Sequence, residues 1–250
     1  MKRLSACLAA MVALAVPAHA ETLRIATDAT FPPFESLDAD GKLVGYDIDL
    51  MTAVCKAAAL ACDIQPAAWD GMIPGLMQGK YDALISQLTV TDQRRKIIAF
   101  SDIYSHPIFR FVARKDSGID ISPEGLAGKT IAVQTGTPMD KFVTAEFPKA
   151  KIKRYDSGSA TYLDLTGGRA DVTISYEAQI RYSFLKSPEG ADYALTGPRY
   201  TGEDSPELGE GVAIALNKRD PELVKAVNAG LAKIREDGTL AALNKTYFGD

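Results

Sequence analysis

Short apolar runs alternate with amphipathic segments along the first hundred residues of the chain. An apolar run of about five residues predicts a strand, whereas apolar side chains at helical spacing, as at Ile48, Met51, Val54 and Ala58, predict a helix. The predicted order is strand, helix, strand, helix and strand, at 23–27, 45–60, 62–67, 70–79 and 82–86. Because this alternation builds a parallel sheet with helices on its faces, we expect an α/β fold.

The same order begins again in the second half of the chain. Strand, turn and helix are predicted over 128–147, and a strand, a helix and a strand follow at 151–157, 160–168 and 170–175. Two long strand-like segments, 101–115 and 209–218, are interpreted as crossings between two α/β units. The prediction is therefore two lobes joined by two hinge strands, with lobe 1 formed by 21–106 and 210–250 and lobe 2 by 107–209.

The helix expected near the C-terminus carries its own start signals. Asp220 is the predicted N-cap of a helix within 220–238, and Pro221 occupies its first position, where a missing N–H does no harm.

Residues 1–20 have the pattern of a secretory signal peptide. Lys2 and Arg3 precede an apolar run from Leu4 to Val16, and Ala18-His19-Ala20 matches an A-x-A cleavage site after Ala20. The apolar run is shorter than the roughly 20 residues that span a membrane, which disfavours a membrane anchor. We expect an exported protein of the periplasm.

The cysteines agree with export. Cys7 leaves with the signal peptide, and Cys55 and Cys62 remain as an even pair in an oxidising compartment. We predict a disulfide between them across the turn that follows helix 45–60. It closes a small loop, so it should stabilise the fold by about 2–3 kcal/mol.

The charge of the chain bears on its partners. The chain has 28 basic and 32 acidic residues, and removal of Lys2 and Arg3 changes this balance to 26 and 32, a net charge of −6. A negative chain is a poor partner for nucleic acid or an anionic membrane, so we expect no nucleic-acid partner.

The segment "ISQLTVTDQRR", 85–95, places polar side chains at a strand end. In open parallel sheets, ligands bind beyond the carboxyl ends of the strands, so Ser86, Gln87 and Thr89 are candidate ligand contacts. Arg94 follows closely, and a guanidinium matches a carboxylate with two parallel hydrogen bonds. The alternative is that Arg94 and Arg95 are solvated charges at the start of a helix.

Several segments together resemble a known family. They are "LRIATDATFPPFES", "LVGYDIDLMTAVC", "WDGMIPGL", "YDALISQLTVTDQRRKIIAFS", "VQTGT", "DLTGGRADV" and "REDGT…YFG". In order and over the mature chain, they are similar to the periplasmic polar amino acid-binding proteins of ABC importers, above all the binders of lysine/arginine/ornithine, histidine and opines. The resemblance implies a type II periplasmic binding protein fold, a monomer without cofactor, and delivery of a polar amino acid to a membrane permease.

The resemblance also implies roles for single residues. Arg94 falls where the family's arginine grips the ligand α-carboxylate, and Ser86, Gln87 and Thr89 fall where the backbone part of the amino acid is bound. Thr137, at a predicted helix N-terminus in "QTGTP", supplies the contact from the second lobe.

The ligand side chain has its own implied contacts. Phe31 and Trp69 match two aromatic walls, and Asp28 matches an acid that meets a cationic side-chain tip. Core packing is the alternative role for both aromatic residues. Gln134 and Tyr176 complete the predicted ligand-binding set.

Two positions depart from the family pattern. Tyr176 stands where the family places an aspartate for the ligand α-ammonium, and a phenol carries no negative charge near pH 7. Either Glu177 or another acid substitutes for it, or the ligand has a substituted amine, as opines do. Pro138 removes a backbone N–H next to Thr137. The ligand is thus left open between a basic amino acid and an opine.

The sequence also bears on two other functions, catalysis and ligand sensing. His106 is the only histidine after signal removal, and the chain has no G-x-S-x-G, Walker A or H-E-x-x-H sequence, so we expect no enzyme. Asp28 and Glu35 are still candidates for acid–base chemistry, and some relatives of the fold are dehydratases. The third possibility is a ligand-sensing module for a membrane receptor.

Overall fold

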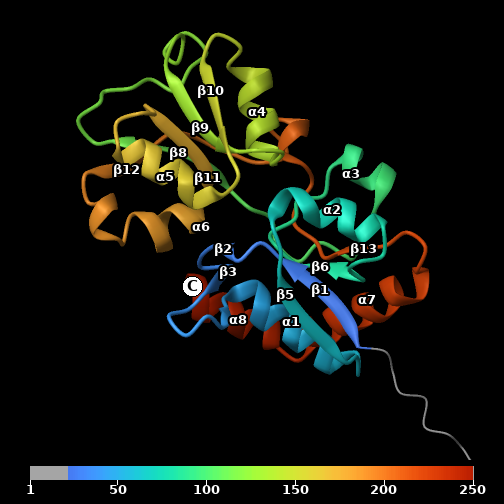
Figure 1. Cartoon of the computed structure of the whole chain (residues 1–250). Coiled ribbons are helices and arrows are strands. Elements are labelled where there is room, and N and C mark those ends of the chain that lie inside the picture. The colour runs from blue at the N-terminus through green and yellow to red at the C-terminus, as the bar shows by residue number, and fades with distance from the viewer. Residues whose placement is uncertain (1–21, 250) are drawn as a thin grey trace, which may run out of the picture.

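The computed structural model describes residues 22–249, so the predicted signal peptide lies outside the described residues. Figure 1 shows two α/β lobes that are joined by extended segments of chain. The predicted two-lobed fold is confirmed.

The first lobe has a five-stranded sheet of order β5-β1-β6-β13-β7. Strands β5, β1 and β6 run parallel, and β13 is antiparallel to both β6 and β7. The strands are β1 (Leu23–Thr27), β5 (Cys62–Pro66), β6 (Ala83–Leu84), β7 (Ala99–Phe100) and β13 (Ala215–Leu216). The helices are α1 (Tyr46–Ala57), α2 (Trp69–Met77), α3 (Asp92–Ile97), α7 (Pro221–Glu236) and α8 (Thr239–Phe248). A small sheet of β2 (Thr30–Phe31), β3 (Glu35–Leu37) and β4 (Leu43–Val44) lies beside α1.

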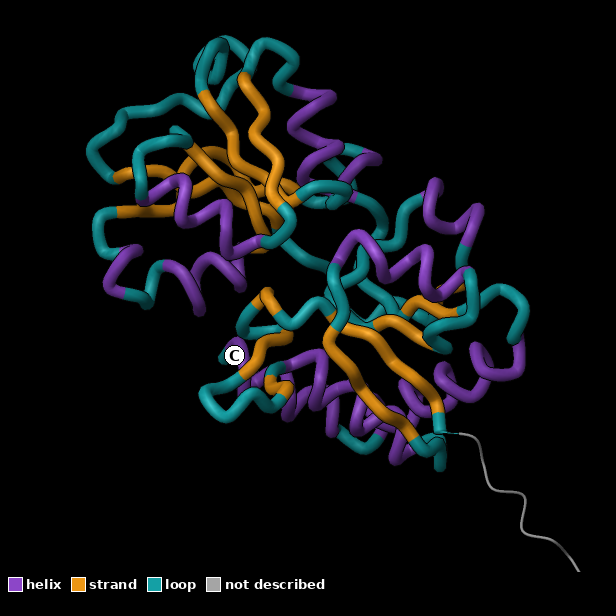
Figure 2. Tube along the Cα trace, viewed as in Figure 1, coloured by secondary structure: helices purple, strands orange, loops and turns teal. Residues whose placement is uncertain are grey.

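The second lobe repeats this plan with the order β10-β9-β11-β8-β12. Strands β10, β9 and β11 are parallel, whereas β8 is antiparallel to its neighbours β11 and β12. The strands are β8 (Phe109–Arg114), β9 (Thr130–Gln134), β10 (Lys151–Tyr155), β11 (Val172–Tyr176) and β12 (Tyr193–Tyr200). The helices are α4 (Pro138–Glu146), α5 (Gly158–Thr166) and α6 (Glu177–Gln179), followed by single turns at Ile180–Phe184, Pro188–Gly190 and Pro206–Leu208. Figure 2 shows how the helices flank the strands in both lobes.

The two crossings are less regular than the sequence suggests. Only Ala215–Leu216 of the predicted strand 209–218 joins a sheet, and residues 210–213 pair through isolated bonds with both the segment 88–90 and the other crossing. Tyr104 N–H donates to Val212 O at 2.9 Å, and Val212 N–H donates to Ser105 O at 2.8 Å. His106 Nδ1 lies 3.2 Å from Glu210 O. The two chain crossings therefore support each other, while the exact lobe boundaries stay a prediction.

Two predicted local features are confirmed. The side chain of Asp220 accepts a hydrogen bond from Leu223 N–H at 2.9 Å and so caps α7. Cys55 and Cys62 form a disulfide that links α1 to β5. Helix α1 ends at Ala57, earlier than expected.

The core of the first lobe lies where α1 packs on α7. Val54 and Leu231 are fully buried there. A side chain at Gly230 would approach Val54 O to 2.7 Å, so glycine allows the two helices to lie this close. Within residues 22–249, no helix combines the length and the apolar character that a membrane crossing requires.

Candidate functional site

The carboxyl ends of strands from both lobes meet at a small cavity. Its volume is about 20 Å³, and its walls include every predicted site residue except Thr89 and Arg94. The lining residues are Asp28, Phe31, Glu35, Trp69, Ser86, Gln87, Gln134, Thr137, Pro138, Met139 and Tyr176. A single water needs roughly 10–15 Å³ of such space. The structure is therefore a closed form, whose cavity has room for about one water.

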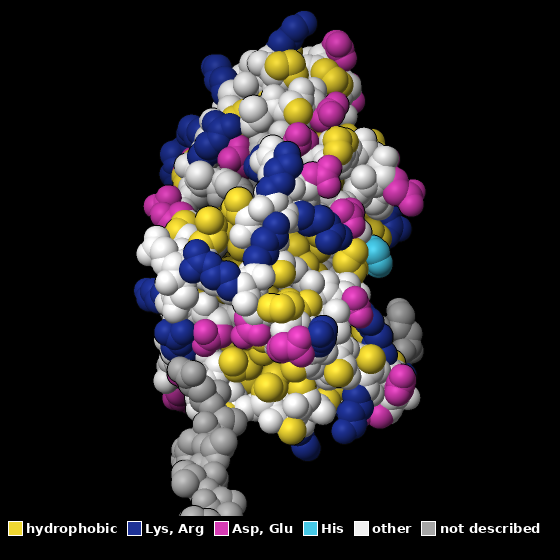
Figure 3. All heavy atoms as spheres, turned by 90° about the vertical axis from the view of Figure 1, so that its right-hand side faces the viewer, with side chains coloured by type: hydrophobic (Ala, Val, Ile, Leu, Met, Phe, Trp, Pro, Cys, Tyr) yellow, Lys and Arg dark blue, Asp and Glu magenta, His cyan; other side chains and the backbone are white. Residues whose placement is uncertain are grey.

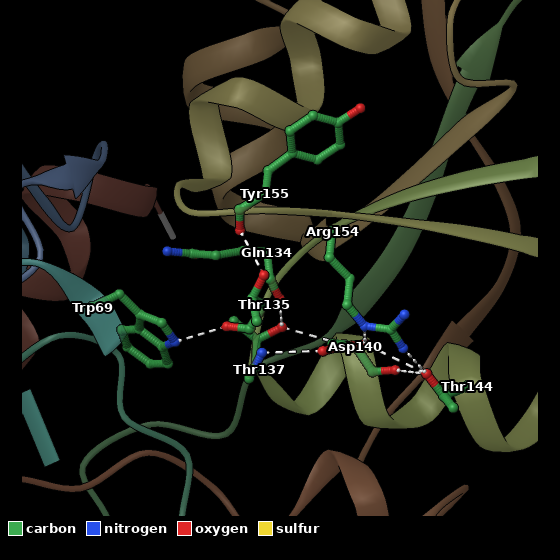
Figure 4. Close-up of polar contacts among 9 residues, drawn as sticks. Trp69, Gln134, Thr135, Thr137, Asp140, Thr144, Arg154 and Tyr155 are labelled. Carbon is green, nitrogen blue, oxygen red and sulfur yellow. Dashed lines mark hydrogen bonds and ion pairs between the residues drawn. The ribbon is translucent and has the colours of Figure 1, made fainter. Parts of the chain in front are cut away.

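Direct hydrogen bonds between the lobes hold this closed form. Gln134 Nε2 donates to Asp28 Oδ2 at 2.9 Å, and Trp69 Nε1 donates to Thr135 O at 3.1 Å. Figure 4 shows the indole nitrogen of Trp69 pointing at the loop after β9, while the Gln134 side chain extends toward the first lobe. These contacts join residues that are distant in sequence and belong to different lobes.

Tyr176 forms a further link between the lobes. Its hydroxyl donates to Gln87 O at 3.0 Å and lies 2.7 Å from Thr89 Oγ1. Because a phenol has one hydrogen to donate, Thr89 is then the donor in the second bond. The hydroxyl of Tyr176 thus reaches from β11 to the strand-end segment 85–90 of the first lobe.

Arg94 is a buried cation between the lobes. Its side chain donates to Thr89 O at 2.9 Å in the first lobe and to Gly136 O at 3.4 Å in the second. Its guanidinium carbon lies 5.5 Å from the centre of the Trp69 ring. Burial lowers the pKa of Arg94 to about 10, so the group stays charged near pH 7.

The surroundings of Arg94 rule out the alternative that it is a solvated charge at the start of a helix. Arg94 is 6% exposed, whereas the adjacent Arg95 is exposed and pairs with Glu210 at 2.7 Å. Among residues 22–249, no carboxylate forms an ion pair with Arg94. It lines a groove of about 400 Å³, and Trp69 lines both this groove and the small cavity. A buried guanidinium without a counter-ion is suited to bind an anion.

The strand-end segment is held in place by a carboxylate behind it. Asp47 accepts hydrogen bonds from Gln87 N–H at 2.6 Å and from Gln87 Nε2 at 2.8 Å. Gln87 has a φ of 44°, in the left-handed region that most residues avoid. Its side chain is therefore engaged with Asp47, and its carbonyl oxygen is the atom that reaches the cleft.

The second-lobe loop is braced by its own helix. Thr137 caps α4 by accepting from Asp140 N–H at 3.2 Å, and it donates to Gln134 O at 2.8 Å. Asp140 accepts from Gly136 N–H at 3.0 Å and from Arg154 Nε at 2.9 Å (Figure 4). This network fixes the loop that faces Trp69 and Arg94.

Aromatic rings form much of the remaining wall. The Phe31 ring meets Tyr176 edge-on at a centroid distance of 5.6 Å and stacks on Phe34 at 5.7 Å. Phe31 is buried and Trp69 is half-buried, and both line the cavity.

Two acids line the cavity, and one of them is absent from the predicted site. Burial raises the pKa of Asp28 to about 6, against hydrogen bonds from Gln134 and Thr30 that lower it. Glu35, on β3, is 1% exposed, and the sequence predicts it only as an acid–base candidate. A glutamate within the aromatic run "FPPFES" is the signal that points to it.

Glu177 does not lie where an acid could replace the family aspartate. It forms ion pairs with Arg110, Arg181 and Arg199 at 3.7, 2.7 and 3.4 Å, and it is not among the cavity-lining residues. Asp28 and Glu35 are the carboxylates that line the cavity.

The fold and the closed interlobe site define a two-lobed binding protein of type II. Over residues 23–250 the sequence matches the bacterial extracellular solute-binding proteins, family 3, and the chain belongs to that family.

Known relatives agree with this assignment. The chain is 36% identical to the lysine/arginine/ornithine-binding periplasmic protein of Escherichia coli (strain K12), over 91% of this chain and 88% of the relative. An ancestral arginine-binding protein bound to arginine is 34% identical with a TM-score of 0.83, covering 91% of this chain and 98% of that one. The ancestral amino acid-binding protein AncCDT-1, a precursor of cyclohexadienyl dehydratase, is 31% identical with a TM-score of 0.80, covering 91% and 95%.

Proposed function

We propose that the protein is the periplasmic solute-binding component of an ABC importer and captures a basic amino acid between its lobes. The family, the two-lobed fold and relatives that bind arginine, lysine and ornithine support this function. In this proposal the signal peptide is removed after Ala20, and the loaded monomer delivers its ligand to membrane permease subunits.

The observation that carries the ligand class is the division of charge across the cleft. Asp28 and Glu35 line the cavity, and no lysine or arginine is among its lining residues. Arg94 lies against the ring of Trp69, which lines the cavity, and is a buried cation without a carboxylate partner among the described residues. An amino acid with a cationic side chain matches both ends, because its carboxylate and its side-chain charge are opposite in sign and far apart.

The proposed binding mode assigns each predicted residue a part. The ligand carboxylate replaces Gly136 O, the longer of the two Arg94 contacts, and its side chain lies along Phe31 and Trp69 toward Asp28. Ser86, Gln87, Thr89, Gln134, Thr137 and Tyr176 surround the rest of the ligand. Contacts that both lobes make with the ligand shift the population from open to closed.

The proposed activity is binding rather than catalysis. The resemblance to a dehydratase precursor keeps an enzyme on the same fold as the alternative, and Tyr176 keeps an opine as the alternative ligand. A sensing role at a membrane receptor would use the same closed form.

A thermal-shift screen tests the ligand class. The panel is arginine, lysine, ornithine, histidine, octopine, nopaline, glutamine and small keto acids. A ligand present at 100 times its Kd stabilises the folded state by about 2.7 kcal/mol, so a basic amino acid should raise Tm clearly. A larger rise in Tm with an opine would mean that an opine, not a basic amino acid, is the ligand. Product formation during incubation would favour the enzyme.

A further inference from the structure

Three buried carboxylates lie close together, and two of them, Asp28 and Glu35, line the cavity. Asp28 follows β1, Glu35 lies on β3 and Asp47 lies in the first turn of α1; they are 5%, 1% and 0% exposed. Ser86 links the first two, since its hydroxyl donates to Glu35 Oε1 at 2.7 Å and accepts from Asp28 N–H at 3.0 Å.

The three acids differ in the hydrogen bonds that they accept. Asp47 accepts three, from Gln87 N–H, Gln87 Nε2 and, at 3.1 Å, the hydroxyl of Tyr104. Glu35 Oε2 is buried and has no hydrogen-bond partner. Donors stabilise the ionised form of a carboxyl group, and burial without donors stabilises the neutral form. Asp47 is therefore the more readily ionised member of this pair, and Glu35 holds its proton more tightly.

The charges around the pair favour the same assignment. One carboxyl group and three phenols face Glu35 and Asp47. The carboxyl group is Asp28, at the end of β1. The phenols are Tyr46 of α1, Tyr104 of the first crossing and Tyr176 of β11. None of these groups is positive. Burial, followed by the negative charge of Asp47, raises the pKa of Glu35 well above its ordinary value.

We propose that Glu35 is a neutral acid in the ligand-free protein and releases its proton to solvent when the cationic side chain of a ligand enters between Glu35 and Asp28. The inference rests on the proposed function and adds two features to it, a role for Glu35 in ligand binding and the release of one proton. The Oε2–H bond breaks, the proton leaves to buffer, and the carboxylate pairs with the ligand cation, which keeps its own charge.

The exchange has a simple electrostatic reason. A buried charge is unfavourable unless it is paired. Glu35 and Asp28, which pair with the ligand cation in this proposal, already lie near the negative charge of Asp47. When one proton leaves as one cation enters, the net charge of the buried site does not change. A ligand with a neutral side chain, such as glutamine, gives no such exchange.

Isothermal titration calorimetry in two buffers measures the released proton. L-Arginine is titrated at pH 7.5 in phosphate and in Tris, whose ionisation enthalpies differ, so a released proton appears as a difference in binding heat. At this pH Asp28 is already mostly ionised, so the signal reports Glu35. We expect release of up to one proton with L-arginine and none with L-glutamine, and an affinity that rises by up to about tenfold per pH unit.

Variants separate Glu35 from its neighbours. Glu35→Gln should bind L-arginine without proton release, whereas the same substitution at the exposed Glu124 should leave the release unchanged. Equal heats in both buffers with measurable binding of L-arginine to the natural protein would overturn the proton exchange alone. No binding of any cationic amino acid would overturn the proposed function, and this inference with it. The natural protein decides the matter even where Glu35→Gln fails to fold.

Discussion

At the scale of single residues, Arg94 is the group on which the proposed binding mode depends. It is buried without a carboxylate partner among the described residues, and its longest hydrogen bond, 3.4 Å to Gly136 O, crosses between the lobes. A carboxylate in that place would form charge-assisted bonds that a carbonyl oxygen cannot match.

Replacement of Arg94 should remove most of the affinity. Loss of one partner of a buried, hydrogen-bonded charge pair costs about 2–5 kcal/mol, or roughly 30-fold or more in Kd. Calorimetry of Arg94→Ala with L-arginine measures this loss, and circular dichroism checks the fold. Arg95→Ala is the matched control, because Arg95 is exposed on the same helix, and it should bind normally. Unchanged affinity in Arg94→Ala would contradict the assignment.

Trp69 should discriminate between charged and neutral ligands. Its ring lines the cavity, and a cation against a ring face gains about 0.5–2 kcal/mol. Trp69→Ala should therefore weaken L-arginine and L-lysine by a larger factor than L-glutamine in the same calorimetric panel. Equal losses across the panel would show that Trp69 only closes the cleft.

The site residues differ in how far the sequence reveals them. Arg94 is a candidate because it closely follows a polar strand end, whereas the role of Asp28 is implied only by the family resemblance. Glu35 stands out in the sequence only as an acid within an aromatic run, because its place beside Asp47, twelve positions away in the chain, depends on the folded hairpin β2–β3. The engagement of Gln87 with Asp47 likewise depends on a left-handed backbone turn that no local pattern encodes.

At the scale of elements, the cleft depends on strands that stop early. Strand β6 ends at Leu84, and the segment that follows is free to present Ser86, Gln87 and Thr89 to the other lobe. The alternating pattern predicted most strands and helices, but not the irregular crossing at 209–214, because its hydrogen bonds come from two distant segments, 88–90 and 101–105.

The disulfide should stabilise the first lobe without affecting the site. Cys62 begins β5, so the bridge lies at the end of the sheet opposite the cleft. Replacing both cysteines by alanine should lower the free energy of unfolding by about 2–3 kcal/mol, measured by denaturant titration. Affinity for L-arginine should change less than about twofold, whereas a large loss would mean that α1 positions Asp47 through the bridge.

At the scale of the whole molecule, the lobes close on each other through direct contacts. Asp28–Gln134, Trp69–Thr135 and Thr89–Tyr176 all cross the cleft. Figure 3 shows one side of this closed form, where basic, acidic and apolar side chains are intermixed and Lys and Arg gather near the middle. Ligand binding has to replace several of these contacts, so closure and binding are coupled.

The buried Asp28 should make the stability of the ligand-free protein depend on pH. Its folded-state pKa of about 6 lies above the ordinary 3.8, so the folded state holds more protons than the unfolded state between these values. Stability from this group is fully present below pH 3.8 and is lost as pH rises through 6, by about 3 kcal/mol.

The difference in stability between the natural protein and the Asp28→Asn variant isolates this effect. The stability of the natural protein minus that of Asp28→Asn, measured by denaturant titration from pH 4 to 7, should fall with rising pH. A difference in stability that does not change with pH would mean that the pKa of Asp28 is not raised in the folded state.

The crystal structure of the protein with L-arginine bound is the most direct test of the central claim. The account predicts density for one ligand in the interlobe cleft, with its α-carboxylate on the guanidinium of Arg94 and its side-chain guanidinium between Asp28 and Glu35. A ligand outside the cleft, or one turned so that its carboxylate faces Asp28, would contradict the account.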